Sequence, residues 1–267
     1  LAADLRQPGD SETVAMLVAD RHDNVGMDSV TRAIGDAGGA TILFDAGDDT
    51  STGEPWEAFS LDSLAKAYDD YDAKYAVAGN HDNGKFVGEY LGDLGFTVLT
   101  GDPVKGSDGI RLLGAPDPRS SNLGSGRTEG AISIETLGEN LADAACASDD
   151  DGERISTMIV HDPDVGSASL QRGCVDLVLA GHQHIQEGPT QVTGANGKIG
   201  TAYTNGTSGG AAYAFALGSK IRRDAEVTLV TYRDGRAVGL QPVTIKTSGE
   251  YVVAPFIDLP GPDPAGG

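Results

Sequence analysis

The segment Val175-Asp176-Leu177-Val178-Leu179-Ala180, followed directly by Gly181-His182-Gln183-His184, carries the clearest fold signal in this chain. A short apolar run with β-branched residues predicts a buried strand. The glycine that follows it lets the backbone turn sharply. In an extended strand end, residues i and i+2 project to the same side, so His182 and His184 are predicted to reach a cation together.

The other histidines occur in the same kind of place. The chain has five, and each lies close to the end of a predicted core strand, the edge at which open α/β sheets bind ligands. Further ligand-type side chains accompany them in the segments Asp20-Arg21-His22, Gly47-Asp48-Asp49, Gly79-Asn80-His81-Asp82 and His161-Asp162. Imidazole, carboxylate and amide groups without a thiolate suit Mn, Fe, Zn or Co.

Each of these motifs also has an ordinary structural explanation. An Asp-x-His segment is usually a loop, and a Gly-Asp pair is usually a turn whose aspartate caps a helix. A lone histidine in a core is usually structural, but that explanation would have to hold for all five histidines. The convergence of several ligand types in one region therefore favours a metal site.

Strands alternate with helices over the first two-thirds of the chain. Apolar runs predict strands at Val14–Ala19, Thr41–Phe44, Tyr75–Ala78, Ser156–Val160 and Val175–Ala180. Helical periodicity lies between them at Met27–Asp36, Pro55–Asp70, Lys85–Leu94 and Ile132–Ala145. This alternation predicts β-α-β units around a largely parallel sheet.

The remaining segments differ in character. Phe96–Leu99 and Ile110–Gly114 are predicted strands before a Pro/Ser/Gly-rich loop at Ala115–Gly130. After His184 the predicted strands are Thr190–Thr193, Gly200–Thr204, Ala211–Leu217, Glu226–Tyr232, Ala237–Lys246 and Tyr251–Ile257. We expect one domain over residues 1–267, with a second, more antiparallel sheet packed on the first and flexible tails at 1–13 and 258–267.

The composition is that of a globular protein with an acidic surface. Hydrophobic residues make up 39 % of the chain, and no apolar run is long enough to span a bilayer. The formal net charge of −21 repels nucleic-acid backbones, so no nucleic-acid binding is expected. A bound metal would still attract a phosphate, because such an ion is the largest local charge.

The two cysteines, Cys146 and Cys174, lie far apart with no Cys-x-x-Cys pair, which excludes a cysteine-rich zinc site. They allow one disulfide, which would suit an oxidising compartment, or two buried free thiols. The sequence favours neither alternative.

Taken in order, Asp-x-His, Gly-Asp, Gly-Asn-His-Asp, His and Gly-His-x-His resemble the motif series of the calcineurin-like metallophosphoesterases. The series spans residues 20–184. The resemblance implies a four-layer αββα sandwich with a dinuclear metal centre, in which the β-rich C-terminal part forms the second sheet. It also implies a hydrolase that acts on a phosphodiester or a phosphomonoester substrate.

The resemblance also implies roles for individual residues. Asp20, His22 and His184 would bind one divalent ion (Mn, Fe or Zn), Asn80, His161 and His182 a second, and Asp48 both. A metal-activated water would attack the phosphate, with His81 as the acid and Asp82 as its orienting neighbour. The alternative is a catalytically silent metal-binding scaffold of the same fold. Such proteins usually lose His81 or a ligand, and neither is lost here.

Some residues depart from the family pattern. Asp49 stands where the family usually has an apolar residue, and Ser51 where it often has an acidic or amide residue. Arg21, between two ligands, is expected to point away from the metals. Arg119 and Arg127 are candidates for substrate contact, although solvated loop charges are the ordinary explanation for both.

Two further segments bear on the surroundings and location of the site. By analogy with the family, Asn205–Gly210 would lie near the rim of the site, unless it is a flexible hairpin loop. His161-Asp162-Pro163 and Thr207-Ser208-Gly209-Gly210 are similar to segments of bacterial members held outside the cytoplasm by an N-terminal anchor helix. We therefore expect an extracytoplasmic protein, with a signal peptide or membrane anchor preceding Leu1.

Overall fold

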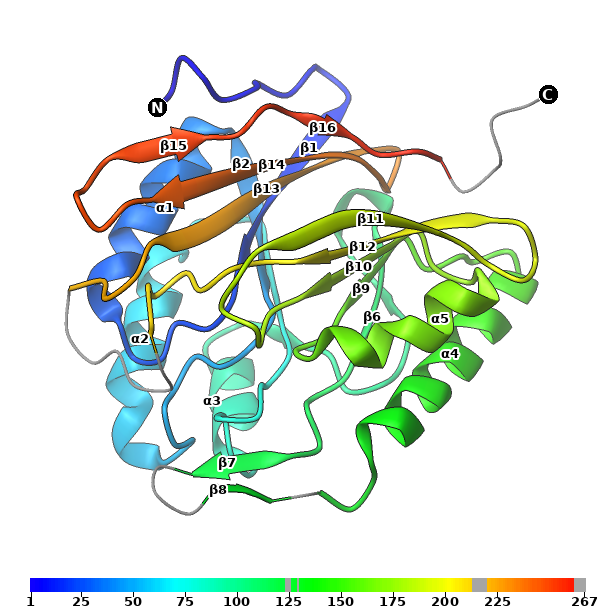
Figure 1. Ribbon diagram of the computed structural model, residues 1–267, viewed down its shortest axis with the longest axis horizontal. Coiled ribbons are helices and arrows are strands. Elements are labelled where there is room, and N and C mark those ends of the chain that lie inside the picture. Colours follow the sequence, from blue (N-terminus) through cyan, green and yellow to red (C-terminus); the bar gives the residue numbers. More distant parts are fainter. Residues whose placement is uncertain (123–125, 129, 213–219, 262–267) are drawn as a thin grey trace.

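A computed structural model describes residues 1–122, 126–128, 130–212 and 220–261 of the chain. Within these residues, two mixed β-sheets lie face to face, and helices cover the outer face of each (Figure 1). The predicted α/β class, with two sheets between layers of helices, is confirmed. None of the helices in the described part is both long and apolar enough to span a membrane.

The first sheet combines a parallel block with an antiparallel one. Its parallel strands are β1 (Glu12–Val18), β2 (Ala40–Asp45), β3 (Ala73–Ala76) and β4 (Thr97–Val98). Its antiparallel strands are β13 (Ala225–Arg233), β14 (Arg236–Ile245), β15 (Tyr251–Val253) and β16 (Ile257–Asp258). The strand order is β15-β14-β13-β1-β2-β3-β4, with β16 paired to β14.

The second sheet has the order β11-β12-β10-β9-β6-β5. These strands are β5 (Val104–Lys105), β6 (Arg111–Gly114), β9 (Thr157–Ile159), β10 (Leu177–Ala180), β11 (Glu187–Thr193) and β12 (Ile199–Thr204). A separate hairpin, β7 (Ser120–Asn122) and β8 (Gly126–Thr128), lies within the predicted loop.

The distribution of strands between the sheets differs from expectation. The β-rich C-terminal part is divided, because β13–β16 join the first sheet and only β11 and β12 join the second. Strands β9 and β10, expected in the first sheet, belong to the second. Apolar patterns predict which faces are buried, but they do not predict which strand becomes a neighbour. Most of the strand predicted at 211–217 lies outside the described residues.

The α-helices agree with the sequence periodicity, and one was not predicted. They are α1 (Asp28–Ala37), α2 (Ala58–Ala67), α3 (Phe86–Asp93), α4 (Ile134–Asp150) and α5 (Ser167–Arg172). Short 3₁₀ helices are η1 (Val25–Met27), η2 (Pro55–Glu57), η3 (Ser107–Gly109) and η4 (Pro163–Gly166). Ser133 caps α4 by accepting a hydrogen bond from the backbone N–H of Thr136. Helix α5 was missed because six residues give too little periodicity to detect.

Three hydrophobic cores separate the four layers. On β1, Val14, Met16 and Val18 face α1–α3, while Ala15 and Leu17 face the second sheet. This alternation follows from the two-residue period of a strand, and it requires both faces of β1 to be apolar. The third core lies between the second sheet and helices α4 and α5. Figure 1 shows α1–α3 and α4–α5 on opposite sides of the paired sheets.

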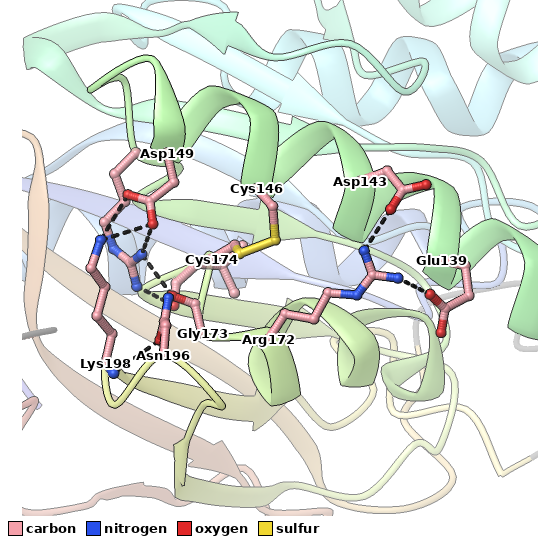
Figure 2. Close-up of a disulfide and its surroundings, with 11 residues drawn as sticks. Glu139, Asp143, Cys146, Asp149, Arg172, Gly173, Cys174, Asn196 and Lys198 are labelled. Carbon is pink, nitrogen blue, oxygen red and sulfur yellow. Dashed lines mark hydrogen bonds and ion pairs between the residues drawn. A yellow bond between two sulfur atoms is a disulfide. The ribbon is translucent and has the colours of Figure 1, made fainter.

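A disulfide joins Cys146 in α4 to Cys174, which follows α5. Figure 2 shows ion pairs on both sides of it. Arg172 pairs with Glu139 and Asp143 on one side, and Lys198 pairs with Asp149 on the other. Of the two alternatives left by the sequence, the structure therefore has the disulfide, which ties together the two helices outside the second sheet.

The segment before β1, expected to be a flexible tail, contacts the body of the protein. Leu5 is buried in the first core, and the backbone N–H of Arg6 donates to Gln241 in β14 at 2.8 Å. The Arg6 guanidinium donates to Glu12 at the start of β1. In the C-terminal tail expected at 258–267, Asp258 ends β16 and Leu259 N–H donates to the Val238 carbonyl at 2.9 Å, whereas 262–267 lie outside the described residues.

Candidate metal centre

The predicted ligands all follow core strands at one edge of the two sheets. The strands end at Val18 (β1), Asp45 (β2), Ala76 (β3), Ile159 (β9) and Ala180 (β10). Hydrogen bonds link neighbouring loops within each sheet, where Asp20 N–H donates to the Gly47 carbonyl at 2.8 Å and Gly181 N–H donates to the His161 carbonyl at 3.0 Å. Between the two sheets, His182 N–H donates to Asp20 Oδ2 at 2.9 Å. The loops of both sheets therefore converge, as is usual for ligand sites in open α/β folds.

Left-handed backbone turns, not extended strand ends, bring the side chains together. Five of the seven predicted ligands have a positive φ: Asp20 (54°), His22 (47°), Asp48 (59°), His182 (73°) and His184 (57°). The expected i and i+2 alternation of an extended strand is therefore wrong as the explanation. Non-glycine residues in this region cost on the order of 1 kcal/mol or more, and such residues cluster at functional sites.

The first group of candidate ligands consists of Asp20, His22 and His184, whose ligand atoms all lie within 4.8 Å of one another. The Nε2 atoms of His22 and His184 are 3.0 Å apart, and His184 Nε2 lies 3.3 Å from Asp20 Oδ1. The other ring nitrogen of His184 is 2.9 Å from the Ala211 carbonyl oxygen. That contact places a proton on Nδ1 and leaves the Nε2 lone pair facing the group.

The second group consists of Asp48, His161 and His182. His161 Nε2 lies 3.2 Å from Asp48 Oδ2 and 3.2 Å from His182 Nδ1. The Ala46 carbonyl oxygen, 2.8 Å from His161 Nδ1, orients this ring in the same way. Asp48 Oδ2 also lies 3.7 Å from His22 Nε2, so this carboxylate stands between the two groups.

Asn80 joins the second group through its amide oxygen, which lies 3.0 Å from His161 Nε2. Its amide nitrogen donates to Ser121 Oγ at 2.8 Å. In this orientation the amide nitrogen points to Ser121 and the amide oxygen faces the site. The structure therefore brings all seven predicted ligand residues together in one place.

The donor set fits cations better than it fits hydrogen bonding among the side chains. Two imidazole Nε2 atoms at 3.0 Å can share only one proton, and His184 already uses its Nδ1 proton elsewhere. In each of the two ligand clusters, nitrogen and oxygen lone pairs from imidazole and carboxylate side chains point to a common centre, and the second cluster adds the amide oxygen of Asn80. Such a mixture of ligands suits divalent metals. The residues therefore fit a dinuclear centre.

Burial and neighbouring charges shift the pKa values of the candidate ligands. Burial lowers the pKa of His22 to about 4, against the attraction of Asp48 and Asp20. Burial also lowers the pKa of His161, but its attraction to Asp48 and the hydrogen bond between them raise it to about 10 overall. Burial raises the pKa of Asp48, yet His161 and His22 hold it well below its usual range. Asp48 is thus an anion under ordinary conditions, ready to bind cations.

His81 lies beside the two groups but is held differently. Its Nδ1 atom is 3.1 Å from the Ser51 carbonyl oxygen, and its backbone N–H donates to Asp48 Oδ1 at 2.8 Å. The His81 ring centroid lies 5.2 Å from that of His22. The side chain is half-buried, so its remaining nitrogen can meet a molecule bound at the ligand cluster.

Asp82 organises the loop after β2. Its buried carboxylate accepts hydrogen bonds from the backbone N–H groups of Asp48 (2.8 Å), Asp49 (3.3 Å), Thr50 (2.9 Å) and Gly79 (2.9 Å). The Thr50 hydroxyl donates to it as well, at 2.8 Å. Burial, with the nearby charges of Asp49 and Asp48, raises the pKa of Asp82 to about 8. The carboxylate thus contacts the loop that carries Asp48, whereas the His81 ring is oriented by Ser51.

The structure describes the surroundings of only one of the two loop arginines, Arg119 and Arg127. Arg119 is 7 % exposed and pairs with both Asp117 and Asp162. Asp162 in turn lies 3.7 Å from His182 Nε2. Arg119 and Asp162 also line a groove of about 580 Å³ beside the start of α4 and α5. Arg127 belongs to β8, and its side chain lies outside the described residues.

The segment Asn205–Gly210 is buried and contacts the turn that carries Asp20. The hydroxyl of Thr207 donates to the Asp20 carbonyl at 2.6 Å, and the hydroxyl of Ser208 donates to the Ala19 carbonyl at 2.8 Å. These contacts hold the left-handed turn that contains Asp20. They involve backbone atoms, so no side-chain pattern could have predicted them.

Some residues that support the site were not predicted from the sequence. Ser121 orients Asn80, and the carbonyl groups of Ala46 and Ala211 orient His161 and His184. Ser121 lies in a Ser/Gly-rich loop of the sequence, and alanine carbonyls carry no chemical signal at all. Only the folded chain identifies these residues.

Comparison with known proteins identifies the fold. No protein-family model and no curated protein sequence matches the chain. A dimetal phosphatase from Danio rerio is similar in structure, with a TM-score of 0.59 and 12 % identity over 93 % of this chain and 99 % of that one. The NAD nucleotidase of Haemophilus influenzae has a TM-score of 0.55 and 14 % identity over 93 % of this chain and 50 % of that one.

A 5′-nucleotidase precursor from Thermus thermophilus is similar to the same degree, with a TM-score of 0.55 and 14 % identity over 93 % of this chain and 54 % of that one. The chain thus spans about half the length of the two nucleotidases. At such low identity the likeness concerns the fold alone. The chain therefore has the fold of the calcineurin-like metallophosphoesterases.

Proposed function

We propose that the protein is a phosphoesterase that depends on two divalent cations and hydrolyses a phosphodiester or a phosphomonoester. The observation that carries this proposal is the position of Asp48, whose Oδ2 atom lies 3.2 Å from His161 Nε2 and 3.7 Å from His22 Nε2. One carboxylate between two clusters of ligands is the arrangement that a dinuclear centre needs.

Each ion would have its own set of side chains. Asp20, His22 and His184 would hold one ion, and Asn80, His161 and His182 the other, with Asp48 shared. When bound, two such ions activate water as a nucleophile and neutralise the charge of the phosphoryl group. Manganese, iron and zinc all suit this mixture of nitrogen and oxygen ligands.

The proposed role of His81 is to protonate the leaving group. The Ser51 carbonyl orients its ring through Nδ1, which leaves Nε2 for the substrate oxygen. Proton transfer from a positioned histidine typically contributes about 10²–10⁴-fold to the rate. Asp82 contributes indirectly, because it holds the loop that carries Asp48 and Ser51.

The surroundings offer room for an extended substrate. The groove lined by Arg119 and Asp162 lies next to His182 and has a volume of about 580 Å³, which would hold the second ester arm of a diester. Asp117 and Asp162 neutralise the charge of Arg119. We therefore propose that Arg119 lines the wall of this groove and does not bind the phosphate group of the substrate. The substrate contact proposed for Arg127 rests on the sequence alone.

We also propose an extracytoplasmic location. The Cys146–Cys174 disulfide supports it, because such bonds persist in oxidising compartments. Expression with and without export, followed by thiol labelling of both products, tests this. Free thiols in the active, exported protein would contradict the proposal.

Metal removal tests the proposed function. Protein stripped with a chelator should not cleave bis-p-nitrophenyl phosphate or p-nitrophenyl phosphate, and added Mn²⁺ should restore cleavage. Asp48→Ala should lose both metal and activity, whereas Asp69→Ala, at an exposed position, should behave as wild type. Full activity in metal-free Asp48→Ala would sink the hypothesis. Two bound ions without hydrolysis of any monoester or diester would instead favour the silent scaffold.

A further inference from the structure

Arg21 stands between the proposed ligands Asp20 and His22, yet its side chain is directed at neighbouring helices. Its Nε and Nη2 atoms donate to the two carboxylate oxygens of Asp28, the first residue of α1, at 2.8 and 2.9 Å. Nη2 also donates to the Ser60 carbonyl in α2 at 3.1 Å. Only 2 % of the Arg21 side chain is exposed, so its geometry is set by these contacts and not by solvent.

The same guanidinium reaches the second ligand-bearing loop. Nη1 of Arg21 donates to Asp49 Oδ1 at 3.0 Å, and the Asp49 side chain is 1 % exposed. Asp49 directly follows Asp48, the carboxylate shared by both groups of ligands. Arg21 thus links the turn that carries Asp20 and His22 to the loop that carries Asp48, and it anchors both to α1 and α2.

Backbone hydrogen bonds also connect the two loops, in addition to the contacts of Arg21. His22 N–H donates to the Asp48 carbonyl at 3.0 Å, and Asp23 N–H donates to the Asp49 carbonyl at 2.9 Å. On the far side, Ser63 Oγ donates to Asp28 Oδ2 at 2.6 Å, which fixes the anchor in place. A buried guanidinium that contacts carboxylates through several nitrogens at once has a rigid geometry.

We propose that Arg21 is a positioning residue for the metal centre, and that Asp49 is its partner in setting the separation between the Asp20–His22 turn and Asp48. This inference rests on the proposed dinuclear function. It also accounts for an acidic side chain at position 49, because the buried Nη1 of Arg21 would lose the hydrogen bond that Asp49 accepts if this residue were apolar.

Metal binding by substituted proteins tests the inference. Arg21→Lys keeps the charge but cannot contact Asp28 and Asp49 through a planar fork. Arg32→Lys is the matched control, because Arg32 lies on α1 and pairs with Asp36 and Asp70 at the surface. Each metal-free protein is titrated with Mn²⁺ against a chelating indicator, and electron paramagnetic resonance reports whether the two ions are coupled.

We expect Arg21→Lys to lose about 10–100-fold in Mn²⁺ affinity, the usual effect of removing a residue that orients ligands, and to lose the signal of coupled ions. Arg32→Lys should stay within about twofold of wild type. Arg21→Met and Asp49→Leu should each weaken binding, and the double variant should lose less than the product of the two effects, because both substitutions remove the same hydrogen bond between Arg21 Nη1 and Asp49 Oδ1.

Thermal unfolding of the metal-free proteins separates positioning from folding. If Arg21→Met does not fold, Arg21→Lys and Asp49→Asn carry the test. Wild-type affinity and coupling in Arg21→Lys, or an equal loss in Arg21→Lys and Arg32→Lys, would overturn the inference alone. A wild-type protein that binds no Mn²⁺ would overturn the proposed function first, and the inference with it.

Discussion

The Nδ1 atom of His81 lies 3.1 Å from the carbonyl oxygen of Ser51. Ser51 belongs to the loop after β2, and the N–H of His81 donates to Asp48 on the same loop at 2.8 Å. Backbone and ring of His81 are therefore fixed against the segment that carries the shared carboxylate. A ring held in this way has one nitrogen free to face a substrate, and it contributes no atom to either group of ligands.

His81→Ala should therefore separate catalysis from metal binding. We expect kcat for bis-p-nitrophenyl phosphate to fall by about 10²–10⁴-fold, because the proton donor is lost, while two ions remain bound. Metal analysis and steady-state kinetics on the same samples check this. His184→Ala is the contrasting variant, which should lose metal as well as activity. Loss of metal in His81→Ala to the same degree would contradict the proposed division of roles.

Asp82→Asn should destabilise the metal-free protein in spite of its similar shape. The carboxylate accepts four backbone N–H groups and one hydroxyl, and the amide nitrogen of asparagine would face donors instead of accepting from them. An unsatisfied buried donor costs about 1–3 kcal/mol, so the free energy of unfolding should fall by about that amount. Denaturant unfolding measures it. Asp69→Asn serves as the exposed control, and an equal effect of both substitutions would refute the role of Asp82.

The sequence predicted this site better than it predicted the sheets. The seven candidate ligands that lie together in the structure could be named because ligand chemistry requires particular side chains, and Asp20, Asp48 and His182 stand in recognisable motifs after apolar runs. Two-sided strands such as β1 could also be predicted, since both of its faces are apolar. The pairing of β1 with β13, more than 200 residues away, could not, because it depends on contacts that no local pattern encodes.

The backbone conformation of the ligand-bearing loops also could not be predicted from the sequence. Left-handed turns at non-glycine residues such as His22 and His184 run against local preference, and tertiary contacts alone maintain them. Thr207 and Ser208 supply such contacts by donating to backbone carbonyls. Any polar loop residue is able to make such a bond, so the sequence does not single out these two. Departures from local preference are expected where a fold builds a functional site.

Removal of the disulfide should lower stability. Cys146 and Cys174 are separated by 28 positions, and closing a loop of that length stabilises a fold by about 3–4 kcal/mol through the unfolded chain. The Cys146→Ser/Cys174→Ser double variant should unfold at correspondingly lower denaturant concentration and still bind metal, because neither residue belongs to the ligand groups. Unfolding of wild type with and without dithiothreitol gives the same comparison. Unchanged stability would show that the bond does not stabilise the fold through the unfolded chain.

The last prediction concerns acid stability and Glu12. Hydrogen bonds from Arg6 and from the backbone of Gly9, with a further one from Arg233, lower the pKa of Glu12 to about 2 from its ordinary value of 4.5. A carboxyl whose pKa is depressed on folding stabilises the protein above its unfolded pKa, and that contribution is lost as the pH falls from about 4.5 to about 2.

Glu12→Gln should therefore lower stability at neutral pH and become equal to wild type near pH 2. The difference should be on the order of 1–2 kcal/mol, because solvent screens the partly exposed Arg6 and Arg233 that contact the carboxylate. Unfolding midpoints of metal-free wild type and Glu12→Gln, measured between pH 2 and pH 7, test this. Glu250→Gln, at an exposed position, controls for the general loss of charge. A difference between wild type and Glu12→Gln that persists unchanged at pH 2 would show that packing, and not the ionised carboxylate, is responsible.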